Sequence, residues 1–547
     1  MILDIYLRFH LAQIGQQETE ETKYMIVIKF SSIRKLGIGY DDSGQPCGFP
    51  RRHHSRLTAN SRLITLITVI IFDLYTPPTF EQESYNNQPS PRESNGSEPK
   101  KKHKARDRIS AIDEAHATIA PYAHHLRLIL ADQDDLLEFE KICQIVECEP
   151  RPIRVPRVDA HAMQFFSPIN LLHVKRWIKT MDWKNAFQIE GYLRCGLLNT
   201  HDLLVTLQKP IEDAIERYGD ASSEFLRFFS DALKTRKADE GPRDCLERMH
   251  SEWKKCTTPK PLAPPLSPLE SEDILQDISC HHVIITPSRI LLEGPYPTQS
   301  NRVIRLYQDH APALAERFIR VEFRDEDHLS YRWDGDVDGA RFLQRRVGTI
   351  LRRGFELGGR EFEFLAYSTS ALREHSVWFV SPFRDPIDGY VTAERIRSSL
   401  GDFSELLRTP SKYAARIAQA FTATDRSIKI RRDQWDEQPD LGPHTDGVGT
   451  ISPQLADMIW DKQCEAGHNV WKRHVKPSAY QFRFLGYKGV VVVDHRLEGV
   501  KMRLRKSQRK FPVNDDEEAY FEIAQSFGKP NKVYLNRFAV VSLFREH

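Results

Sequence analysis

The chain has 547 residues, of which 40% are hydrophobic and 28% are charged, a composition typical of folded globular protein. A chain of this length is expected to hold about three to four domains. The 78 basic and 76 acidic residues leave a net charge of only +2, which excludes attraction of nucleic acid by a global positive field. Any affinity for nucleic acid must therefore come from local clusters of cations.

Cysteine spacing and apolar runs argue against two further classes of protein. No CxxC pair occurs among the eight scattered cysteines, so a structural zinc site is not expected. Scattered thiols in a large chain favour the nucleus or the cytoplasm over an oxidising compartment. The apolar run at residues 63–72 (LITLITVIIF) is far shorter than the roughly 20 residues that cross a bilayer, so it predicts a buried strand and no membrane association.

Residues 1–107 are predicted to be a poorly ordered N-terminal extension. Residues 84–104 are rich in Asn, Pro, Ser, Glu and Lys, and such a segment buries too little apolar surface to offset the entropy of ordering it. The extension ends in a basic tract at residues 100–106 (KKKHKAR). This tract is typical of a nuclear-localisation or polyanion-binding segment, and equally of a solvated run of charge.

A helical domain and a linker are predicted next. Residues 108–256 form the helical domain, because apolar residues recur at helical spacing from Ile109 to Ile119 and continue through residues 126–130. Residues 257–279 form a proline-rich linker through which helix cannot propagate.

The second half of the chain is predicted to mix helices and strands. Residues 280–440 are predicted to form a mixed α/β domain, and the strands of residues 441–547 a small sheet or barrel. The expected strands are 282–286, 302–307, 318–323, 361–367, 489–494 and 500–504. The expected helices are a basic amphipathic one at 341–355 and another at 413–421.

Arg483 and Lys488 are the first candidates for phosphate binding, within residues 480–489 (YQFRFLGYKG). On a plain strand their odd spacing would place them on opposite faces. A bulge or bend at Gly486 would bring both to one side. Arginine suits bidentate contact with phosphate oxygens, and lysine supplies a movable point charge. The alternative is a pair of unrelated surface cations.

A second group of cations lies in residues 501–510. Lys501, Arg503 and Arg505 share one strand face, so they are candidates for contacts with an RNA backbone. A strand edge guarded by cations is the ordinary alternative.

Two acidic turns give only weak evidence for phosphate or metal binding. Asp446 and Gly447 predict a tight turn without a phosphate-cradling loop. Residues 334–339 (DGDVDG) are acidic enough for a divalent cation, but no second carboxylate cluster lies near them in the sequence. A solvated turn is therefore favoured, and no metal ligand is predicted in this chain.

An ordered series of segments adds to this reading. In chain order the segments are 286–295 (TPSRILLEGP), 301–305 (NRVIR), 318–327 (FIRVEFRDED), 368–379 (STSALREHSVWF), 415–422 (ARIAQAFT), the turn at Asp446, 480–489, 507–511 (SQRKF) and 534–537 (YLNR). Together they resemble the cellular, eukaryotic RNA-dependent RNA polymerases of RNA silencing, most closely their fungal branch. The resemblance covers roughly residues 283–544, and Ala418 stands where the family has glycine.

The resemblance implies a multidomain α+β fold: a helical N-terminal region, a mixed slab domain, and then one double-psi β-barrel of a two-barrel RNA polymerase. It implies that Arg483, Lys488 and Lys510 contact nucleotide and RNA phosphates. Arg416 and Gln419 match a family motif without an assigned role. The implied partners are a single-stranded RNA template, nucleoside triphosphates and silencing-pathway proteins, with Mg²⁺ as cofactor of the full-length enzyme, which makes double-stranded RNA for gene silencing.

One departure from the family concerns the metal. The family's second barrel holds magnesium with an Asp-x-Asp-Gly-Asp loop, which does not occur in this sequence; residues 336–340 (DVDGA) come nearest. The chain is therefore expected to be a partial polymerase without the second barrel, with no catalytic metal ligands and inactive by itself. The alternative is a non-catalytic RNA-binding fragment or a scaffold derived from such a polymerase.

Overall fold

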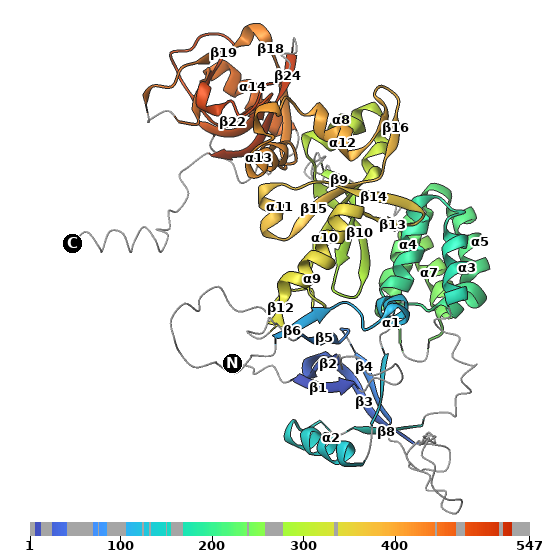
Figure 1. Ribbon diagram of the computed structural model, residues 1–547. Coiled ribbons are helices and arrows are strands. Elements are labelled where there is room, and N and C mark those ends of the chain that lie inside the picture. Colours follow the sequence, from blue (N-terminus) through green and yellow to red (C-terminus); the bar gives the residue numbers. More distant parts are fainter. Residues whose placement is uncertain are drawn as a thin grey trace, which may run out of the picture. The chain divides into compact units, whose positions relative to one another are not determined.

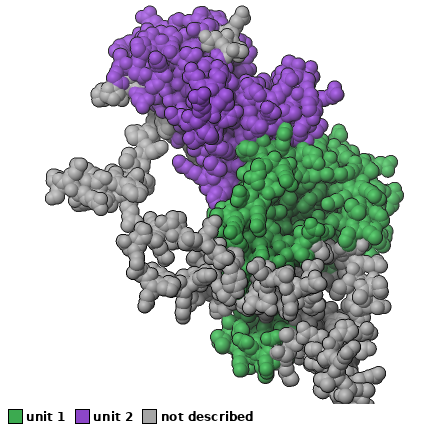
Figure 2. Space-filling model, in the orientation of Figure 1, with its two compact units in different colours: residues 1–259, 282–294, 321–364 green, residues 260–281, 295–320, 365–547 purple. Residues whose placement is uncertain are grey.

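The computed structural model groups the chain into two compact units. Residues 1–259, 282–294 and 321–364 form unit 1, and residues 260–281, 295–320 and 365–547 form unit 2 (Figure 2). The structure describes residues 6–11, 24–40, 69–74, 76–84, 105–122, 125–130, 133–148, 150–154, 168–237, 240–257, 277–332, 337–442, 446–465, 476–513 and 518–527 (Figure 1). Among these residues no helix has the length and apolar character needed to span a bilayer.

Unit 1 begins with two β-sheets. The first has the order β1 (Tyr6–Leu11), β2 (Tyr24–Lys29), β5 (Thr79–Ser84), β6 (Ala105–Ile109) and β12 (Val337–Asp338). The second has the order β7 (His125–Ile129), β4 (Val69–Leu74), β3 (Ile33–Tyr40) and β8 (Arg151–Arg154). One hydrophobic core takes Ile28 and Phe80 from the first sheet, Phe72 from the second and Phe139 from helix α2 (Gln133–Ile145). Helix α1 (Glu114–Ile119) lies between β6 and β7 in the sequence.

These sheets correct two predictions. The described parts of residues 1–107 are strands with a buried core, so the expected poorly ordered extension is wrong for them. The helix expected from Ile109 through residues 126–130 is confirmed only at Glu114–Ile119. Residues 126–130 were expected in a helix and lie largely in β7, which pairs with β4 and places Leu126 opposite Phe72. Leu128 and Leu130 are buried at alternate positions, which is the period of a strand. The buried strand predicted within 63–72 is confirmed for its described part, residues 69–72.

The basic tract is shorter than its sequence suggests. Arg106 belongs to β6, is buried, and pairs with Glu81 at 2.8 Å, so it is not part of a solvated cationic segment. Residues 85–104 lie outside the described residues.

The helical prediction is confirmed for the second part of residues 108–256. The helices are α3 (Pro168–Ile178), α4 (Trp183–Arg194), α5 (Gln208–Tyr218), α6 (Ser222–Lys234) and α7 (Pro242–Thr257). Their apolar faces meet in a core that includes Ile189, Tyr192, Phe225 and Phe229. Of the predicted linker, residues 258–276 lie outside the described part of the chain.

The middle of the chain forms a six-stranded sheet. Its order is β10 (Ile290–Gln299), β9 (Asp277–Ile285), β11 (Phe318–Phe323), β15 (Ser376–Val380), β14 (Arg360–Ala366) and β13 (Phe355–Leu357). The expected strands at 282–286, 318–323 and 361–367 are therefore confirmed. The expected basic helix is present as α9 (Gly339–Arg345) and α10 (Val347–Arg353). The remaining elements are α11 (Thr369–Arg373), β16 (Phe383–Asp385), β17 (Gly389–Val391) and α12 (Ala393–Ser399).

The strand expected at 302–307 is wrong, because these residues begin helix α8 (Arg302–His310). Asn301 caps the helix, its side-chain oxygen accepting hydrogen bonds from the backbone N of Val303 and of Ile304, both at 3.1 Å. Val303, Ile304 and Tyr307 are buried in one core, a spacing that fits a helix face. The cap therefore outweighs the strand preference of the β-branched pair.

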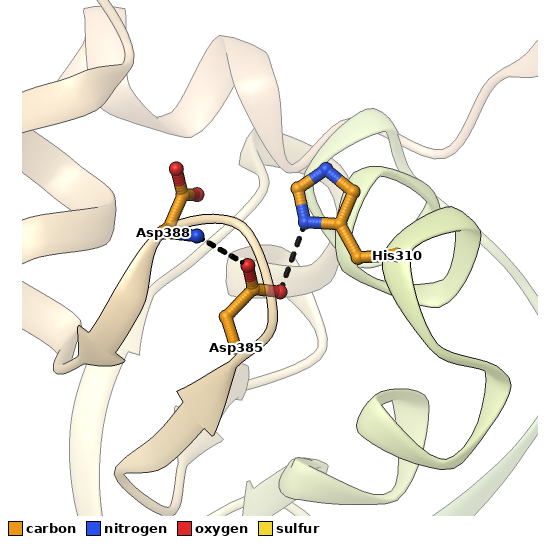
Figure 3. A group of neighbouring side chains, drawn as sticks. All are labelled: His310, Asp385 and Asp388. Carbon is orange, nitrogen blue, oxygen red and sulfur yellow. Dashed lines mark hydrogen bonds and ion pairs between the residues drawn. The ribbon is translucent and has the colours of Figure 1, made fainter.

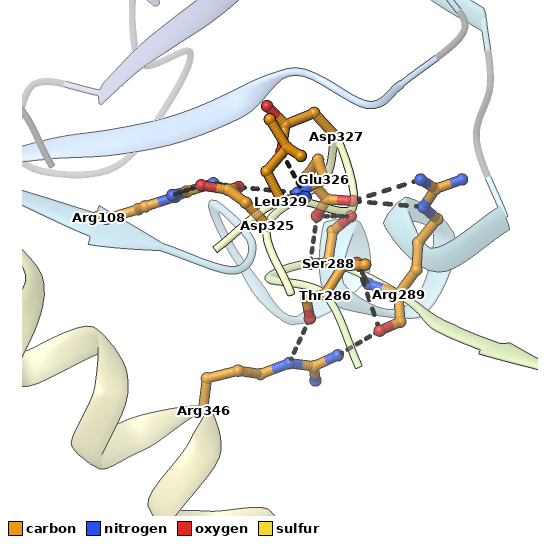
Figure 4. A network of polar contacts seen from close by, with 9 residues as sticks. All are labelled: Arg108, Thr286, Ser288, Arg289, Asp325, Glu326, Asp327, Leu329 and Arg346. Atoms are coloured by element: carbon orange, nitrogen blue, oxygen red, sulfur yellow. Dashed lines mark hydrogen bonds and ion pairs between the residues drawn. The ribbon is translucent and has the colours of Figure 1, made fainter. Parts of the chain in front are cut away.

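A buried ionic network in unit 1 fastens the turn between β9 and β10 (Figure 4). Arg108 on β6 donates two hydrogen bonds to Asp325, at 2.8 and 2.5 Å. Glu326 accepts hydrogen bonds from the backbone N of Ser288 at 2.7 Å and from its Oγ at 2.8 Å. Arg346 donates to the backbone oxygen of Thr286 at 3.1 Å. The 286–295 motif therefore serves to hold this turn.

The last part of unit 2 is a mixed seven-stranded sheet. Its order is β18 (Asp425–Arg431), β24 (Glu518–Phe527), β21 (Ala479–Phe484), β22 (Tyr487–Val493), β20 (Val448–Ile451), β23 (Met502–Arg505) and β19 (Trp435–Gln438). The pairs β20–β22 and β19–β23 are parallel. Helix α13 (Pro410–Ala420) precedes β18 in the sequence, and helix α14 (Pro453–Glu465) lies between β20 and β21. The core of this sheet includes Ile451, Tyr480 and Phe482. The predicted strands at 489–494 and 500–504, the helix at 413–421 and the mixed α+β fold are confirmed.

Candidate phosphate-binding site

A tight hairpin brings the first two predicted cations together. Arg483 on β21 lies directly opposite Lys488 on β22, and Leu485 and Gly486 form the turn between them. Residues directly opposite in an antiparallel pair project to the same face of the sheet. The predicted bend at Gly486 is therefore confirmed, and it is the turn of a hairpin. Leu485 takes the left-handed conformation, with φ of 41°.

Lys510 is held against the turn of this hairpin. Its backbone N donates a hydrogen bond to the backbone oxygen of Gly486 at 2.9 Å. A Cβ atom on Gly486 would lie 1.9 Å from the backbone oxygen of Phe511, so only glycine permits this approach. The Phe511 ring lies 4.9 Å from the ring of Phe403 within a buried core. Lys510 is therefore fixed by the turn on one side and by its neighbour's packing on the other.

Arg416 on α13 is the fourth member of the group. The pKa of Lys488 is lowered first by its burial, and then by the positive charges of Arg483, Arg416 and Lys510. Lys488 therefore lies close to all three cations. We refer to Arg416, Arg483, Lys488 and Lys510 as the cation cluster. All four side chains are half-buried.

The cation cluster has no carboxylate partner among the described residues. Arg483 donates from Nη1 to the backbone oxygen of Phe482 at 2.8 Å, and Lys510 donates to the backbone oxygen of Ser507. The Nε atoms of Arg416 and Arg483 are buried without a hydrogen-bond partner. Like charges brought together in a partly dry site repel one another, so an anion bound among them is favoured. Phosphate suits the site, because guanidinium groups bind its oxygens in pairs.

The motif that contains Lys510 also holds the neighbouring turn. Ser507 Oγ donates to Asp440 at 2.5 Å and accepts from the backbone N of Gly447 at 3.0 Å. Gln508, which is fully buried, donates to the backbone oxygens of Gly447 at 3.2 Å and Val490 at 3.1 Å. Asp446 and Gly447 therefore form the predicted tight turn, and Gly447 has a φ of 74°.

Lys501, Arg503 and Arg505 share one face, as predicted. They alternate with buried Met502 and Leu504, so they project away from the core. Lys501 Nζ donates to the backbone oxygen of Asp433 at 2.8 Å, and Arg505 donates to that of Pro439 at 2.9 Å. Their contact with an RNA backbone stays a prediction.

Arg416 is the site residue that spacing in the sequence did not find. It lies far from residue 483 in the chain, and the lone signal for it was the ordered motif at 415–422. Within that motif, Gln419 Nε2 donates to the backbone oxygen of Tyr487 at 3.5 Å, which links α13 to the first residue of β22. The motif therefore places Arg416 beside the hairpin.

One group of side chains has the composition of a metal site (Figure 3). His310, Asp385 and Asp388 offer ligand atoms within 4.8 Å of one another. The Asp385 carboxylate, however, already accepts hydrogen bonds from His310 Nδ1 at 2.9 Å and from the backbone N atoms of Ile387 and Asp388. These contacts lower its pKa and fasten the β16–β17 turn. We assign this group a structural role.

The acidic residues at 334–339 are described in part. Residues 333–336 lie outside the described residues. Asp338 caps α9, its carboxylate accepting a hydrogen bond from the backbone N of Ala340 at 2.8 Å. That aspartate therefore acts as a helix cap.

We expect Lys488→Met to stabilise the protein at neutral pH. Folding lowers the pKa of Lys488, so its charge costs stability at every pH below that pKa. The cost disappears as the pH rises through the lowered value toward the ordinary lysine pKa. The gain should therefore be largest near pH 7 and shrink by pH 10, as measured by thermal unfolding. Lys462→Met, at an exposed position, is the control; equal melting temperatures for the wild type and Lys488→Met at pH 7 would contradict this.

The second half of the chain is similar to known RNA-dependent RNA polymerases. A family model described as RNA dependent RNA polymerase matches residues 285–545. RNA-dependent RNA polymerase 1 of Arabidopsis thaliana is 35% identical over 317 residues, which is 55% of this chain and 26% of that protein. RNA-dependent RNA polymerase 1 of Schizosaccharomyces pombe is 34% identical over 237 residues, 42% of this chain and 18% of that protein.

Among solved structures, RNA dependent RNA polymerase QDE-1 from Thielavia terrestris gives a TM-score of 0.43 at 15% identity, covering 68% of this chain and 39% of that one. The chain thus spans about a quarter or less of the length of the two polymerases to which it aligns in sequence. Residues 285–545 are similar to the eukaryotic cellular RNA-dependent RNA polymerases.

Proposed function

We propose that the cation cluster binds the phosphates of RNA and of nucleoside triphosphates in an enzyme that copies single-stranded RNA into complementary RNA. The observation that carries this is the cluster itself. Four half-buried cations converge from α13, the β21–β22 hairpin and residue 510, with no carboxylate partner among the described residues. A nucleic-acid backbone or a triphosphate supplies the missing negative charge.

We infer that the seven-stranded sheet is the first double-psi β-barrel of a two-barrel polymerase. Its support is the mixture of parallel pairs, β20–β22 and β19–β23, within an otherwise antiparallel order. In such an enzyme Mg²⁺ supplies charge stabilisation during phosphoryl transfer. The described residues offer one candidate group of metal ligands, at His310, and its central carboxylate is already fully hydrogen-bonded. To the described residues we therefore assign the binding of phosphate, and we route no metal step through the His310 group.

We also propose three further properties of this protein. These are placement in the fungal branch, location in the nucleus or the cytoplasm, and the supply of double-stranded RNA to silencing-pathway proteins. The identity to the plant and fission-yeast polymerases supports the shared activity.

Removing two cations should weaken RNA binding. We expect Lys488→Ala with Lys510→Ala to lower the affinity for a single-stranded RNA oligonucleotide and to flatten its salt dependence. Each lost phosphate contact removes about 0.7 from the slope of log affinity against log salt. Fluorescence anisotropy across a salt series measures both quantities.

The control variant removes the same charge elsewhere in the barrel region. Lys429 and Lys462 are exposed and already paired with Glu518 and Glu465. Lys429→Ala with Lys462→Ala should therefore keep most of the affinity. Equal losses in the two double variants would show that net charge alone governs binding and would count against the site.

RNA synthesis can be tested separately. We expect this chain, given a single-stranded template, nucleoside triphosphates and Mg²⁺, to incorporate no nucleotide above background, because its sequence has no Asp-x-Asp-Gly-Asp loop. Incorporation of labelled nucleotide measures this. Template-dependent synthesis well above a no-enzyme control would show that other residues hold the metal.

A further inference from the structure

One carboxylate, that of Glu522, lies beside the cation cluster. Glu522 on β24 is directly opposite Arg483 on β21 in the sheet. It is buried, and its negative charge acts on the Arg483 guanidinium. Oppositely charged residues in such a cross-strand position ordinarily attract each other and pair. A pair of this kind would neutralise Arg483.

Both carboxylate oxygens of Glu522 instead accept hydrogen bonds from Arg305 and Thr424. Its Oε1 accepts a hydrogen bond from Arg305 Nη2 at 2.9 Å, and its Oε2 accepts one from Thr424 Oγ1 at 3.1 Å. Arg305 also donates to the backbone oxygen of Thr424 at 2.5 Å and to its Oγ1 at 2.8 Å. Arg305, Thr424 and Glu522 are all buried, so this arrangement has a defined geometry.

The backbone around Arg305 holds that side chain in place. Asn301 caps the start of α8, and the backbone N of Thr424 donates to the backbone oxygen of Ser300 at 3.2 Å. Arg305 therefore projects from the first turns of a helix that is tied to the segment carrying Thr424. The other cation opposite Glu522 in the sheet, Arg426, is paired with Asp309 at 2.7 Å.

We propose that Arg305 is a positioning residue that withholds the Glu522 carboxylate from Arg483 and so sets the anion affinity of the cation cluster. This rests on the proposed function for the identity of the anion, which is RNA or nucleotide phosphate. With Arg305 present, the charge of Glu522 is compensated within the buried group. The charge of Arg483 is then left for phosphate. Without Arg305, Glu522 pairs with Arg483 and the cation cluster loses one positive charge.

Three variants of the full chain test this proposal. Arg305→Gln should weaken binding of a single-stranded RNA oligonucleotide about fivefold at 0.1 M salt, as expected for one lost phosphate contact. Arg305→Gln with Glu522→Gln should restore the affinity, because the released carboxylate is gone. Glu522→Gln alone should bind RNA at least as tightly as the wild type. Circular dichroism and thermal unfolding check that each variant is folded.

A purely structural role for Arg305 gives a different pattern. The double variant would then bind as weakly as Arg305→Gln or more weakly, and this result would overturn the proposal. If Arg305→Gln does not fold, the proposal is tested by Glu522→Gln alone. A lower RNA affinity of Glu522→Gln than of the wild type would contradict the proposal, because this variant only removes a negative charge near Arg483.

A second readout needs no RNA. Modification of Arg483 by phenylglyoxal, mapped by mass spectrometry, should slow in Arg305→Gln and recover in the double variant, because pairing with Glu522 protects a guanidinium. Unchanged Arg483 reactivity in all variants would overturn the proposal whatever the RNA data show. If reactivity follows the expected pattern while RNA affinity is the same in all variants and the wild type, the proposed function fails and the pairing of Glu522 with Arg483 stands.

Discussion

Gly486→Ala should destabilise the seven-stranded sheet of unit 2 by about 3 kcal/mol and strongly weaken the proposed RNA binding, because the new methyl group has no room. The added Cβ would lie 1.9 Å from the backbone oxygen of Phe511, and no side-chain rotation can relieve a contact between a Cβ and a backbone atom. The segment that carries Lys510 must then move away from the hairpin. Urea unfolding and RNA anisotropy measure the two effects.

Gly499→Ala is the matched control in the same region. Gly499 has a φ of 69°, and no heavy atom outside its chain neighbours lies within 4 Å of the position a Cβ would take, so alanine there meets backbone strain of about 1 kcal/mol without a clash. RNA affinity should be retained. If Gly486→Ala loses no more stability than Gly499→Ala, the close approach of Phe511 to Gly486 contributes little to stability.

Glu326→Ala should destabilise unit 1 by about 3–5 kcal/mol, since it leaves buried donors without their acceptor. Glu326 is 4% exposed and accepts from both the backbone N and the Oγ of Ser288. Arg289, which is also buried, would lose its ion pair with Glu326, 3.4 Å away. The midpoint of the urea transition measures the loss.

The adjacent residue supplies the control for this prediction. Asp327 is exposed, and its carboxylate accepts one hydrogen bond from the backbone N of Leu329 at 3.0 Å. Asp327→Ala should cost no more than about 1 kcal/mol. A loss for Glu326→Ala no larger than that of Asp327→Ala would mean that the network in Figure 4 contributes little to stability.

Local features of the fold could be predicted where one pattern dominated. The hairpin at Gly486 and the strands at 282–286 and 318–323 follow from alternation and glycine position. Residues 302–307 were predicted wrongly, because the β-branched pair Val303 and Ile304 favours a strand while the cap at Asn301 decides for a helix. Residues 126–130 were predicted wrongly because a short apolar run fits either period until its partner, β4, is known.

In the candidate site, too, residues close together in the sequence were easier to predict than residues that the fold brings together. Arg483 and Lys488 could be named as candidates from the sequence, but their spacing left their relative placement open until the turn at Gly486 was known. Arg416 and Glu522 could not be placed beside them, because α13 and β24 reach the hairpin through contacts between distant segments. The residue pattern of a single sequence predicts which side chains share a face of one helix or strand. The net charge of a site depends also on which distant helices and strands pack together.

Phe511 connects the proposed phosphate site to a hydrophobic core of unit 2. Its ring packs beside Phe403 in a hydrophobic core, while the preceding residue contributes its charge to the hairpin. A substitution that repacks the core around Phe403 would therefore shift Lys510 and change affinity at a distance. Apolar positions in the interior of unit 2 are therefore expected to influence the proposed phosphate site, although their side chains carry no charge.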